Sequence, residues 1–342
     1  MKLKDRINDL VELGQWIQQD LYYNSEVISK AIADNPWFTR DSINQALKAV
    51  SLQYLSADCL SAWVSGEQIT ETTRQKIIGI VMAGNIPLVG IHDLLAVLIT
   101  GHKALIKASD RDLALLESVV HRLYEMHDYW RDSIELTHKL SDLGAVIATG
   151  SDSTARYFEK YFSAYPHIIR KNRHGVGIVF KDDTGDQMKG LADDVLSYFG
   201  LGCRNISKLY LEKGVEIDSL FEHFESHGDT IHHNKYKNNY DYNYALFLLN
   251  KDEFYTNNFL LLKKHDHISS RIASVHYEYF DNTYDLKNKL NRQISQIQCV
   301  MSSRDIDGLN CFRFGYAQKP GLTDYADGVN TIEFLKSLDG NS

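Results

Sequence analysis

The stretch Lys76-Ile-Ile-Gly-Ile-Val-Met-Ala-Gly-Asn-Ile-Pro-Leu88 decides the fold class of this chain of 342 residues. Its first seven residues are mostly apolar and predict a buried strand, which the turn-forming residues 84–87 end. The next apolar run, 91–100, predicts a helix, and Lys103-Ala-Leu-Ile-Lys107 predicts a second short strand. A strand, a helix and a strand in this order are typical of a parallel β-α-β unit.

The same alternation continues along the chain. It predicts helices at 112–129, 153–162 and 187–199, and strands at 145–148, 167–169 and 177–180. Residues 1–65, before the first strand, have apolar residues at helical spacing. We therefore expect an α/β fold with a mainly parallel sheet. Helices should cover both faces of that sheet, and a ligand should bind at the carboxyl ends of its strands.

A second set of elements follows residue 182. The sequence predicts a helix at 215–226, a long polar loop at 227–243, and strands at 209–211, 244–249, 259–262 and 295–301. We place the domain boundary at this point. Residues 1–181 are predicted to form a nucleotide-binding domain with N-terminal helices, and residues 182–342 a catalytic domain that carries the thiol and a C-terminal tail.

The composition is that of a soluble globular protein. Apolar residues make up 44% of the chain and charged residues 24%, and the formal net charge is −8. This acidic balance argues against nucleic acid or an anionic membrane surface as the main partner. The N-terminus has no apolar signal-peptide core, and polar residues interrupt the most apolar stretch, 77–106. We expect no membrane span and a cytoplasmic location.

Several kinds of site are not expected, because the sequence lacks the motifs that are typical of them. The four cysteines form no C-x-x-C pair, and the fourteen histidines show no known metal-ligand spacing, so we expect no metal site. The histidines between 223 and 267 are expected to be solvated or hydrogen-bonded. The chain also has no Walker A motif and no G-x-S-x-G motif of a serine hydrolase.

A candidate nucleophile lies in Phe199-Gly-Leu-Gly-Cys-Arg-Asn205. Two glycines let the backbone turn close to a ligand, and a thiol at such a turn, Cys203, is exposed enough to react. A neighbouring backbone N–H can face a developing oxyanion. The alternative is a small buried cysteine, because a cysteine often packs as a small apolar residue.

Polar residues also follow three predicted strands of the first half. Asn85 can donate a side-chain hydrogen bond to a substrate oxygen, and Lys107 can hold ribose hydroxyls or phosphate. Thr149-Gly-Ser151 offers backbone N–H groups and a hydroxyl to an anion, just before a helix. Each has an ordinary alternative: a turn-forming Asn, a strand-end Lys and a helix N-cap.

Taken in order, these segments resemble the aldehyde dehydrogenase superfamily. The segments are Ile77-Ile-Gly-Ile-Val-Met-Ala-Gly-Asn-Ile-Pro-Leu88, Ala104-Leu-Ile-Lys-Ala-Ser109, Ala148-Thr-Gly-Ser151 and Gly200-Leu-Gly-Cys-Arg204. The resemblance implies that Cys203 is the nucleophile and that Asn85 and the Cys203 backbone N–H hold the oxyanion. It also implies that Lys107 meets the adenosine ribose and that Thr149, Gly150 and Ser151 lie near the pyrophosphate.

Three segments are similar to the acyl-CoA reductase branch of that superfamily, the LuxC-type fatty acyl reductases of bacterial luminescence. They are Ile169-Arg-Lys-Asn-Arg-His-Gly-Val-Gly-Ile-Val179, Phe199-Gly-Leu-Gly-Cys-Arg204 and Asp324-Tyr-Ala-Asp-Gly328. This resemblance implies an aldehyde-dehydrogenase-like fold, with a Rossmann-type nucleotide-binding domain plus an α/β catalytic domain. It implies an NAD(P)H-dependent reductase that converts an acyl-CoA or other acyl thioester to a fatty aldehyde through an S-acyl cysteine.

Two segments depart from the oxidising aldehyde dehydrogenases. Those enzymes carry a Glu that activates water to hydrolyse the acyl-enzyme, whereas this chain has Arg170-Lys-Asn-Arg-His-Gly175, with no carboxylate. The missing base suits a thioester that is reduced or passed to another thiol, and His174 is a weaker candidate acid or base. The Glu-x-Phe-Gly-Pro motif on the nicotinamide side is not apparent either, and Gln298-Cys-Val300 lies roughly in its place.

The residues leave the choice of cofactor open. Asp110 favours NADH because a carboxylate can bond the ribose 2′-hydroxyl, whereas Ser109 and Arg111 favour a 2′-phosphate. The resemblance favours NADPH, with NADH as the alternative. We also expect a homo-oligomer, and an acyl-donor protein is a further candidate partner.

Two other functions stay open on the sequence. An acyl phosphate reductase of the same fold is compatible with Arg173-His-Gly-Val-Gly-Ile-Val179. An acyl-carrying partner protein would keep the thiol and lack hydride transfer.

Overall fold

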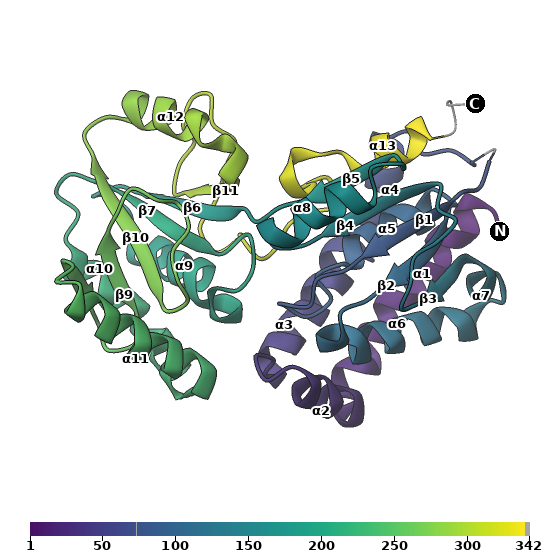
Figure 1. Cartoon of the computed structure of the whole chain (residues 1–342), viewed down its shortest axis with the longest axis horizontal. Helices are drawn as coiled ribbons and strands as arrows, with labels where there is room; N and C mark the ends of the chain where they lie inside the picture. Colours follow the sequence, from purple (N-terminus) through teal and green to yellow (C-terminus); the bar gives the residue numbers. More distant parts are fainter. Residues whose placement is uncertain (73, 339–342) are drawn as a thin grey trace. The chain divides into compact units, whose positions relative to one another are not determined.

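The chain forms two compact units in a computed structural model that describes residues 1–72 and 74–338. Unit 1 comprises Met1–Asn172 and Pro320–Ser342, and unit 2 comprises Arg173–Lys319 (Figure 1). Each unit is built on a sheet of its own. Unit 1 is therefore discontinuous in the sequence, and unit 2 is inserted into it.

Sheet A of unit 1 is a five-stranded parallel sheet with the order β3-β2-β1-β4-β5. Its strands are β1 (Ile77–Val81), β2 (Lys103–Lys107), β3 (Ile134–Leu136), β4 (Ala145–Thr149) and β5 (His167–Arg170). The parallel sheet predicted from the sequence is confirmed, and β3 is an addition. Because β2 and β4 pair with opposite sides of β1, the strand order reverses at β1, which makes a topological switch point.

Alternate residues of β1 face two different apolar layers. Ile78 and Ile80 are buried in the larger core, together with α1 (Leu3–Gln19), α5 (Ile91–Ile99) and α6 (Leu113–Met126). A Cβ on Gly79 would lie 2.9 Å from Leu143 of the second cluster, against which Phe158 of α8 (Asp152–Tyr161) packs. Both faces of the sheet are thus covered, as alternation along a strand requires.

The other helices of unit 1 lie in the N-terminal region, after β2 and in the C-terminal segment. They are α2 (Ser25–Asp34), α3 (Arg40–Ala49), α4 (Ala57–Gly66), α7 (Tyr129–Ser133) and α13 (Thr331–Ser337). The helical N-terminal region expected from the sequence is confirmed. None of the helices among the described residues is both long and apolar enough to cross a membrane.

The C-terminal segment belongs to unit 1, whereas the sequence placed it with the second domain. The indole N–H of Trp63 donates to the Tyr325 hydroxyl at 2.8 Å, and that hydroxyl donates to Glu67 at 2.9 Å. Ile332 and Leu335 of α13 are buried in the larger core. An apolar helical face shows that a segment is buried, but not which unit buries it. The division before Arg173 also lies nine residues ahead of the predicted one, at 182.

Tyr325→Phe should weaken the attachment of this segment. The variant loses the hydroxyl that links Trp63 to Glu67 and leaves the indole N–H without its acceptor. We expect the free energy of unfolding to fall by about 1–3 kcal/mol, measured by urea denaturation. Tyr316→Phe is the matched control, because Tyr316 is exposed. Equal stability of Tyr325→Phe and the natural protein would contradict a stabilising role of this contact.

Sheet B of unit 2 has seven strands in the order β12-β11-β6-β7-β10-β9-β8. All neighbouring strands are parallel except the pair β8 and β9. The strands are β6 (His174–Val179), β7 (Ile206–Glu212), β8 (Phe254–Thr256), β9 (Leu261–Lys264), β10 (Ser274–Phe280), β11 (Ile297–Ser302) and β12 (Cys311–Phe312). Three of the predicted strands overlap β7, β9 and β11, and β10 was not predicted.

Helices also cover both faces of sheet B. Val176 and Ile178 of β6 share a core with Leu286 and Leu290 of α12 (Thr283–Arg292). A Cβ on Gly177 would point the other way, to within 3.2 Å of Leu191 in α9 (Gly185–Leu196). The helices α12 and α9 therefore lie on opposite faces (Figure 1). The predicted helix at 215–226 is confirmed as α10 (Ile217–Phe224).

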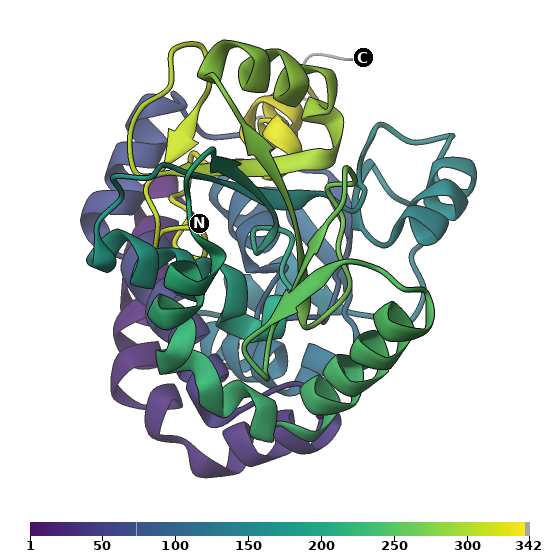
Figure 2. The ribbon, with the colours of Figure 1, turned by 90° about the vertical axis from the view of Figure 1, so that its left-hand side faces the viewer.

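The predicted loop at 227–243 and the predicted strand at 244–249 are both wrong. Residues 225–232 form 3-10 turns, and α11 (Asn234–Leu249) lies beside the β8–β9 end of the sheet (Figure 2). The Tyr236 hydroxyl donates to the carbonyl of Phe259 at 3.0 Å, and the Asn243 amide donates to that of Ile272 at 2.9 Å. Tyr244 and Leu249 are exposed, so this apolar run ends a surface helix. Ala, Leu and Phe without β-branched residues do not specify a strand.

Candidate active site

The carboxyl ends of three strands lie side by side at one edge of sheet A. Val81, the last residue of β1, pairs with Lys107 of β2 and with Ala148 of β4. Asn85 follows β1, Lys107 ends β2, and residues 149–151 follow the buried part of β4. The structure thus brings the predicted cofactor residues and Asn85 to the edge where open parallel sheets bind ligands.

Buried polar groups hold the loop between β1 and α5 that carries Asn85. The Asn35 amide donates to the carbonyl of Gly84 at 3.0 Å, and the N–H of Leu88 donates to Asp112 at 2.7 Å. A Cβ on Gly84 would lie 2.6 Å from Ser109 Oγ, so only glycine fits there without a shift. The exposed Asn85 therefore sits on a loop packed directly against the end of β2.

Asp112 is a buried carboxyl group beneath this loop, and the sequence did not single it out. Burial raises its pKa well above the usual range, although the backbone N–H groups of Leu88 and Val89 lower it in part. Asp112 also lines a small hollow, whose other walls include Met82, Ile91 and Ser109. The position of Asp112 fits an anchor for the loop, since its carboxylate accepts from the loop backbone.

Ser151 begins α8 as its N-cap. Its hydroxyl accepts from the backbone N–H of Thr154 at 3.3 Å, and Ser151 itself is exposed. A Cβ on Gly150 would lie 3.0 Å from the Thr154 side chain, which makes the turn tight. The N-cap alternative is confirmed, and the contact of Thr149, Gly150 and Ser151 with a pyrophosphate stays a prediction.

Cys203 lies in the turn between α9 and β7 of unit 2. Cys203 is exposed, whereas its neighbours Gly202, Arg204 and Asn205 are all buried. The alternative of a small buried cysteine is therefore wrong. The residues on either side of Cys203 are packed into the unit, and Cys203 between them reaches the surface.

The side chain of Asn205 fixes this turn. Its Oδ1 accepts from the N–H of Gly202 at 2.8 Å, and its Nδ2 donates to the carbonyls of Asp194 at 3.0 Å and Ser197 at 2.8 Å. A third carbonyl, that of Val195, lies at 3.4 Å. One buried amide therefore joins the end of α9 to the turn that carries Cys203. The Asn at the end of the Gly-Cys-Arg-Asn segment was a signal for such a turn, because Asn side chains bond nearby backbone groups.

Strained backbone precedes the turn. Tyr198, Phe199 and Gly200 have φ of 52°, 60° and 74°, in the left-handed region. Two consecutive aromatic residues in that region are costly, at about 1–2 kcal/mol each. The Phe199 ring packs on His233, with centroids 4.2 Å apart. Such strain persists where the surroundings impose it, and it concentrates at functional sites.

Arg204 of the turn and Asp194 of α9 are two more buried groups, and both bond a C-terminal loop of unit 2. Arg204 Nε donates to the carbonyl of Ala317 at 2.5 Å. On the same loop, the N–H groups of Gly315 and Ala317 donate to the carboxylate of Asp194 at 2.8 and 2.9 Å. Burial raises the pKa of Asp194 to about 7. The sequence reasoning missed Asn205 and Asp194, which touch no substrate and act through the backbone.

Asn205→Asp should loosen the turn while keeping its shape. The aspartate can still accept from Gly202, but it brings carboxylate oxygens against the three carbonyls to which the amide donates. We expect a loss of at least 2 kcal/mol in the free energy of unfolding, because a buried charged group stays unpaired. Asn238→Asp is the control, since Asn238 is exposed. A variant as stable as the natural protein would contradict the role assigned to Asn205.

Asp194→Asn should change how stability depends on pH. A folded-state pKa of about 7, above the unfolded value of about 3.9, means that the folded state binds more protons between these limits. The contribution of Asp194 to the free energy of unfolding is therefore fully present below pH 4 and is lost as pH rises through 7. The free energy of unfolding of Asp194→Asn minus that of the natural protein should therefore be about 2–3 kcal/mol higher at pH 8 than at pH 5.

Urea denaturation of both proteins at pH 5 and pH 8 measures this difference, because every other titrating group is common to them. Asp186→Asn is the matched control, since the Asp186 side chain lies on the same helix and is 96% exposed. A difference between Asp194→Asn and the natural protein that does not vary with pH would contradict the prediction.

Comparison with known proteins identifies the fold. No protein family model matches the sequence, and no curated protein matches it either. Solved structures do match. Aldehyde dehydrogenase 21 from Physcomitrella patens, solved with the reaction product succinate, matches 98% of this chain and 83% of its own, with a TM-score of 0.70 at 10% identity. The chain has the aldehyde dehydrogenase fold.

Two more structures agree with this fold. An NAD-dependent aldehyde dehydrogenase from Sinorhizobium meliloti matches over 88% of this chain and 70% of its own, with a TM-score of 0.65 at 13% identity. An indole-3-acetaldehyde dehydrogenase solved with NAD⁺ matches over 88% and 72%, with a TM-score of 0.65 at 12% identity. The fold expected from the sequence is thereby confirmed.

Proposed function

We propose that this protein is an NAD(P)H-dependent acyl-CoA reductase, which forms a fatty aldehyde through an S-acyl intermediate on Cys203. The observation that carries the proposal is the exposed Cys203 on a turn fixed by buried polar groups, in a chain with the aldehyde dehydrogenase fold. A reactive thiol has to reach the substrate from a rigid support, and this turn meets both conditions.

The first half-reaction is an acyl transfer to the thiol. The thiolate of Cys203 attacks the carbonyl carbon of the acyl-CoA. The C–S bond between the acyl group and coenzyme A then breaks, and coenzyme A leaves as its thiolate. The Asn85 amide and the backbone N–H of Cys203 are the proposed donors to the oxyanion. Loss of one such donor costs on the order of a hundredfold in rate.

The segment between β5 and β6 supports reduction rather than hydrolysis of the S-acyl enzyme. It reads Arg170-Lys-Asn-Arg-His-Gly175 and offers no carboxylate to activate water. Its Arg170 is buried and donates to Thr331 at 2.9 Å and to Asp93, so that side chain serves the packing of unit 1. An acyl-enzyme that water does not attack persists until it is reduced.

The edge of sheet A fits a dinucleotide cofactor. The loops after β1 and β4, which carry Gly84 and Gly150, follow neighbouring strands, and the exposed Lys107 ends β2 on the other side of β1. These three segments therefore lie in a row at the carboxyl ends of the strands, where open parallel sheets bind dinucleotides. A reduced nicotinamide held there would supply the hydride to the acyl carbon, and the C–S bond to Cys203 would break to release the aldehyde and the free thiolate. We propose NADPH, with Lys107 and Ser109 holding its adenosine half.

Intact-mass measurement after incubation with a long-chain acyl-CoA tests the proposal. The natural protein should gain the mass of one acyl group, and NADPH should remove the adduct and release one equivalent of aldehyde. Cys203→Ala should show no adduct. Cys59→Ala is the matched control and should acylate like the natural protein, since Cys59 lies on α4 of unit 1.

Other outcomes point to other functions. An adduct formed from an acyl phosphate but not from acyl-CoA would identify an acyl phosphate reductase. An adduct that neither NADPH nor NADH removes, together with no binding of either cofactor, would identify an acyl-carrying protein. The absence of any adduct on Cys203 would overturn the proposal.

A further inference from the structure

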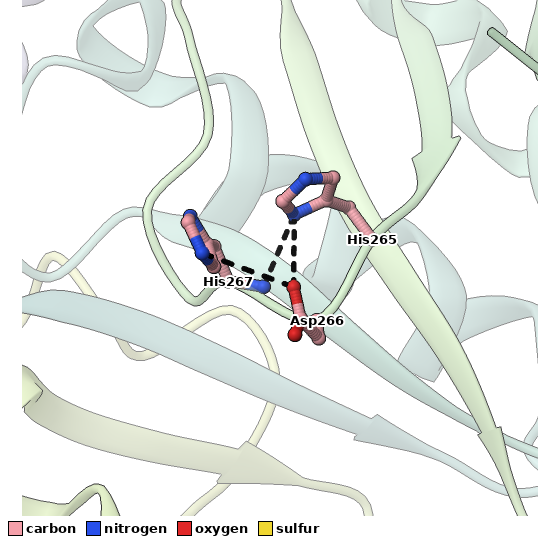
Figure 3. Close-up of side chains that lie close together, drawn as sticks. All are labelled: His265, Asp266 and His267. Carbon is pink, nitrogen blue, oxygen red and sulfur yellow. Dashed lines mark hydrogen bonds and ion pairs between the residues drawn. The ribbon is translucent and has the colours of Figure 1, made fainter.

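The loop between β9 and β10 gathers three metal-ligating side chains. The Nδ1 atom of His265 lies 3.4 Å from Asp266 Oδ1, and the Nε2 atom of His267 lies 3.9 Å from the same oxygen (Figure 3). The ligand atoms of the three residues all lie within 4.8 Å of one another. The sequence analysis expects no metal here, because the histidines show no known metal-ligand spacing. The three ligand atoms come from consecutive residues of one loop.

The distances suit tetrahedral coordination. Nitrogen and oxygen ligands lie about 2.0–2.2 Å from Zn²⁺, so two ligands at the tetrahedral angle are about 3.3–3.6 Å apart. The separation of 3.4 Å between His265 and Asp266 already fits, and that of 3.9 Å between Asp266 and His267 is slightly larger. The His267 side chain is 75% exposed, so a small rotation of its ring closes the difference.

The backbone of this loop is held at several points. The N–H of His265 donates to the carbonyl of Tyr277 at 3.2 Å, and the buried Lys208 ammonium donates to the carbonyl of His265. The carbonyl of His267 lies 2.9 Å from Nδ1 of His276. Both histidines of the cluster are therefore attached to a fixed frame, and a metal ion would order side chains rather than backbone.

The charged surroundings permit a cation. Lys208 is the nearest buried positive group, and it pairs with Glu278 at 2.7 Å. The His276 ring packs on that of His265, with centroids 4.6 Å apart. Asp266 contributes the negative charge at the surface.

One backbone contact assigns the tautomer of His265. The N–H of His267 donates to Nδ1 of His265 at 3.2 Å, so this nitrogen carries a lone pair and no proton (Figure 3). A metal ion bound at Nδ1 would take the place of this hydrogen bond. A deprotonated imidazole nitrogen is the form that binds a metal. Two imidazoles and one carboxylate favour a transition-metal ion over Mg²⁺ or Ca²⁺, which prefer all-oxygen sites.

We propose that His265, Asp266 and His267 bind a divalent transition-metal ion of the Zn²⁺ type, with water in the remaining position. Two imidazoles and one carboxylate with an open position form a donor set that zinc accepts. The site belongs to unit 2 alone and does not depend on the function proposed for Cys203.

Calorimetric titration of the metal-free full-length protein, produced without a polyhistidine tag, with ZnCl₂ tests this proposal. The natural protein should bind one equivalent, and binding should persist in a Cys203→Ala background, which removes the exposed thiol as a rival ligand. His267→Ala should weaken this binding at least tenfold. MgCl₂ should give no saturable binding.

His232→Ala is the matched control, because His232 is exposed and lies 3.8 Å from a carboxylate oxygen of Asp229, an exposed pair outside the cluster. This variant should bind Zn²⁺ like the natural protein. A visible Co²⁺ spectrum of a tetrahedral site, lost in His267→Ala, would add support. No saturable Zn²⁺ binding, or equal binding by the natural protein and His267→Ala, would overturn the proposal.

Discussion

The presentation of Cys203 depends on the buried amide of Asn205. That side chain satisfies backbone groups from Asp194 to Gly202, and the backbone carbonyl of Asn205 accepts from the N–H of Gly175 in β6 at 3.0 Å. A Cβ on Gly175 would lie 2.6 Å from the carbonyl of Arg204, so the strand below allows no side chain at that point. The position of the thiol is therefore set by the helix before it and by a central strand of sheet B.

Buried polar side chains also hold the loops at the carboxyl ends of the strands of sheet A. Asn85 and Lys107 are exposed, and the groups that hold their segments, Asn35 and Asp112, are buried. A polar side chain is costly to bury unless its hydrogen bonds are made, so each such group specifies one arrangement of the loop above it. In both units, the predicted site residues are exposed, and the loops that carry them rest on buried polar residues that bond the backbone.

The sequence predicted four of the five strands of sheet A, mostly short apolar runs followed by a turn, and missed β3, which has only three residues. The exposed positions of Asn85, Lys107 and Cys203 followed from the same turns. The sequence did not reveal α11, because its residues 234–243 are polar and lack an apolar face of helical period. It also missed Ser274-Val-His-Tyr-Glu-Tyr-Phe280, the strand β10, whose polar residues conceal its burial in a sheet.

Supporting residues were the least predictable part of the site. Asp194 acts on backbone groups that only the folded chain brings within reach, and Asp112 acts on a loop more than twenty positions away. Asn205 also bonds Gly202, three residues before it, which is the one local contact that the sequence could have indicated. Side chains that will react can be recognised by their type and their turn. Side chains that hold the turn have common types and no fixed spacing.

The insertion of unit 2 into unit 1 has a consequence for synthesis on the ribosome. The core of unit 1 includes Ile332 and Leu335, and the Lys76 ammonium beside β1 donates to the carbonyl of Leu338 at 2.5 Å. The first part of unit 1 is therefore synthesised before unit 2, and the last part of unit 1 leaves the exit tunnel only after all of unit 2. Unit 2 has its whole sequence available earlier and can fold as a unit while its host still exposes apolar surface, the state in which nascent chains are most prone to aggregate.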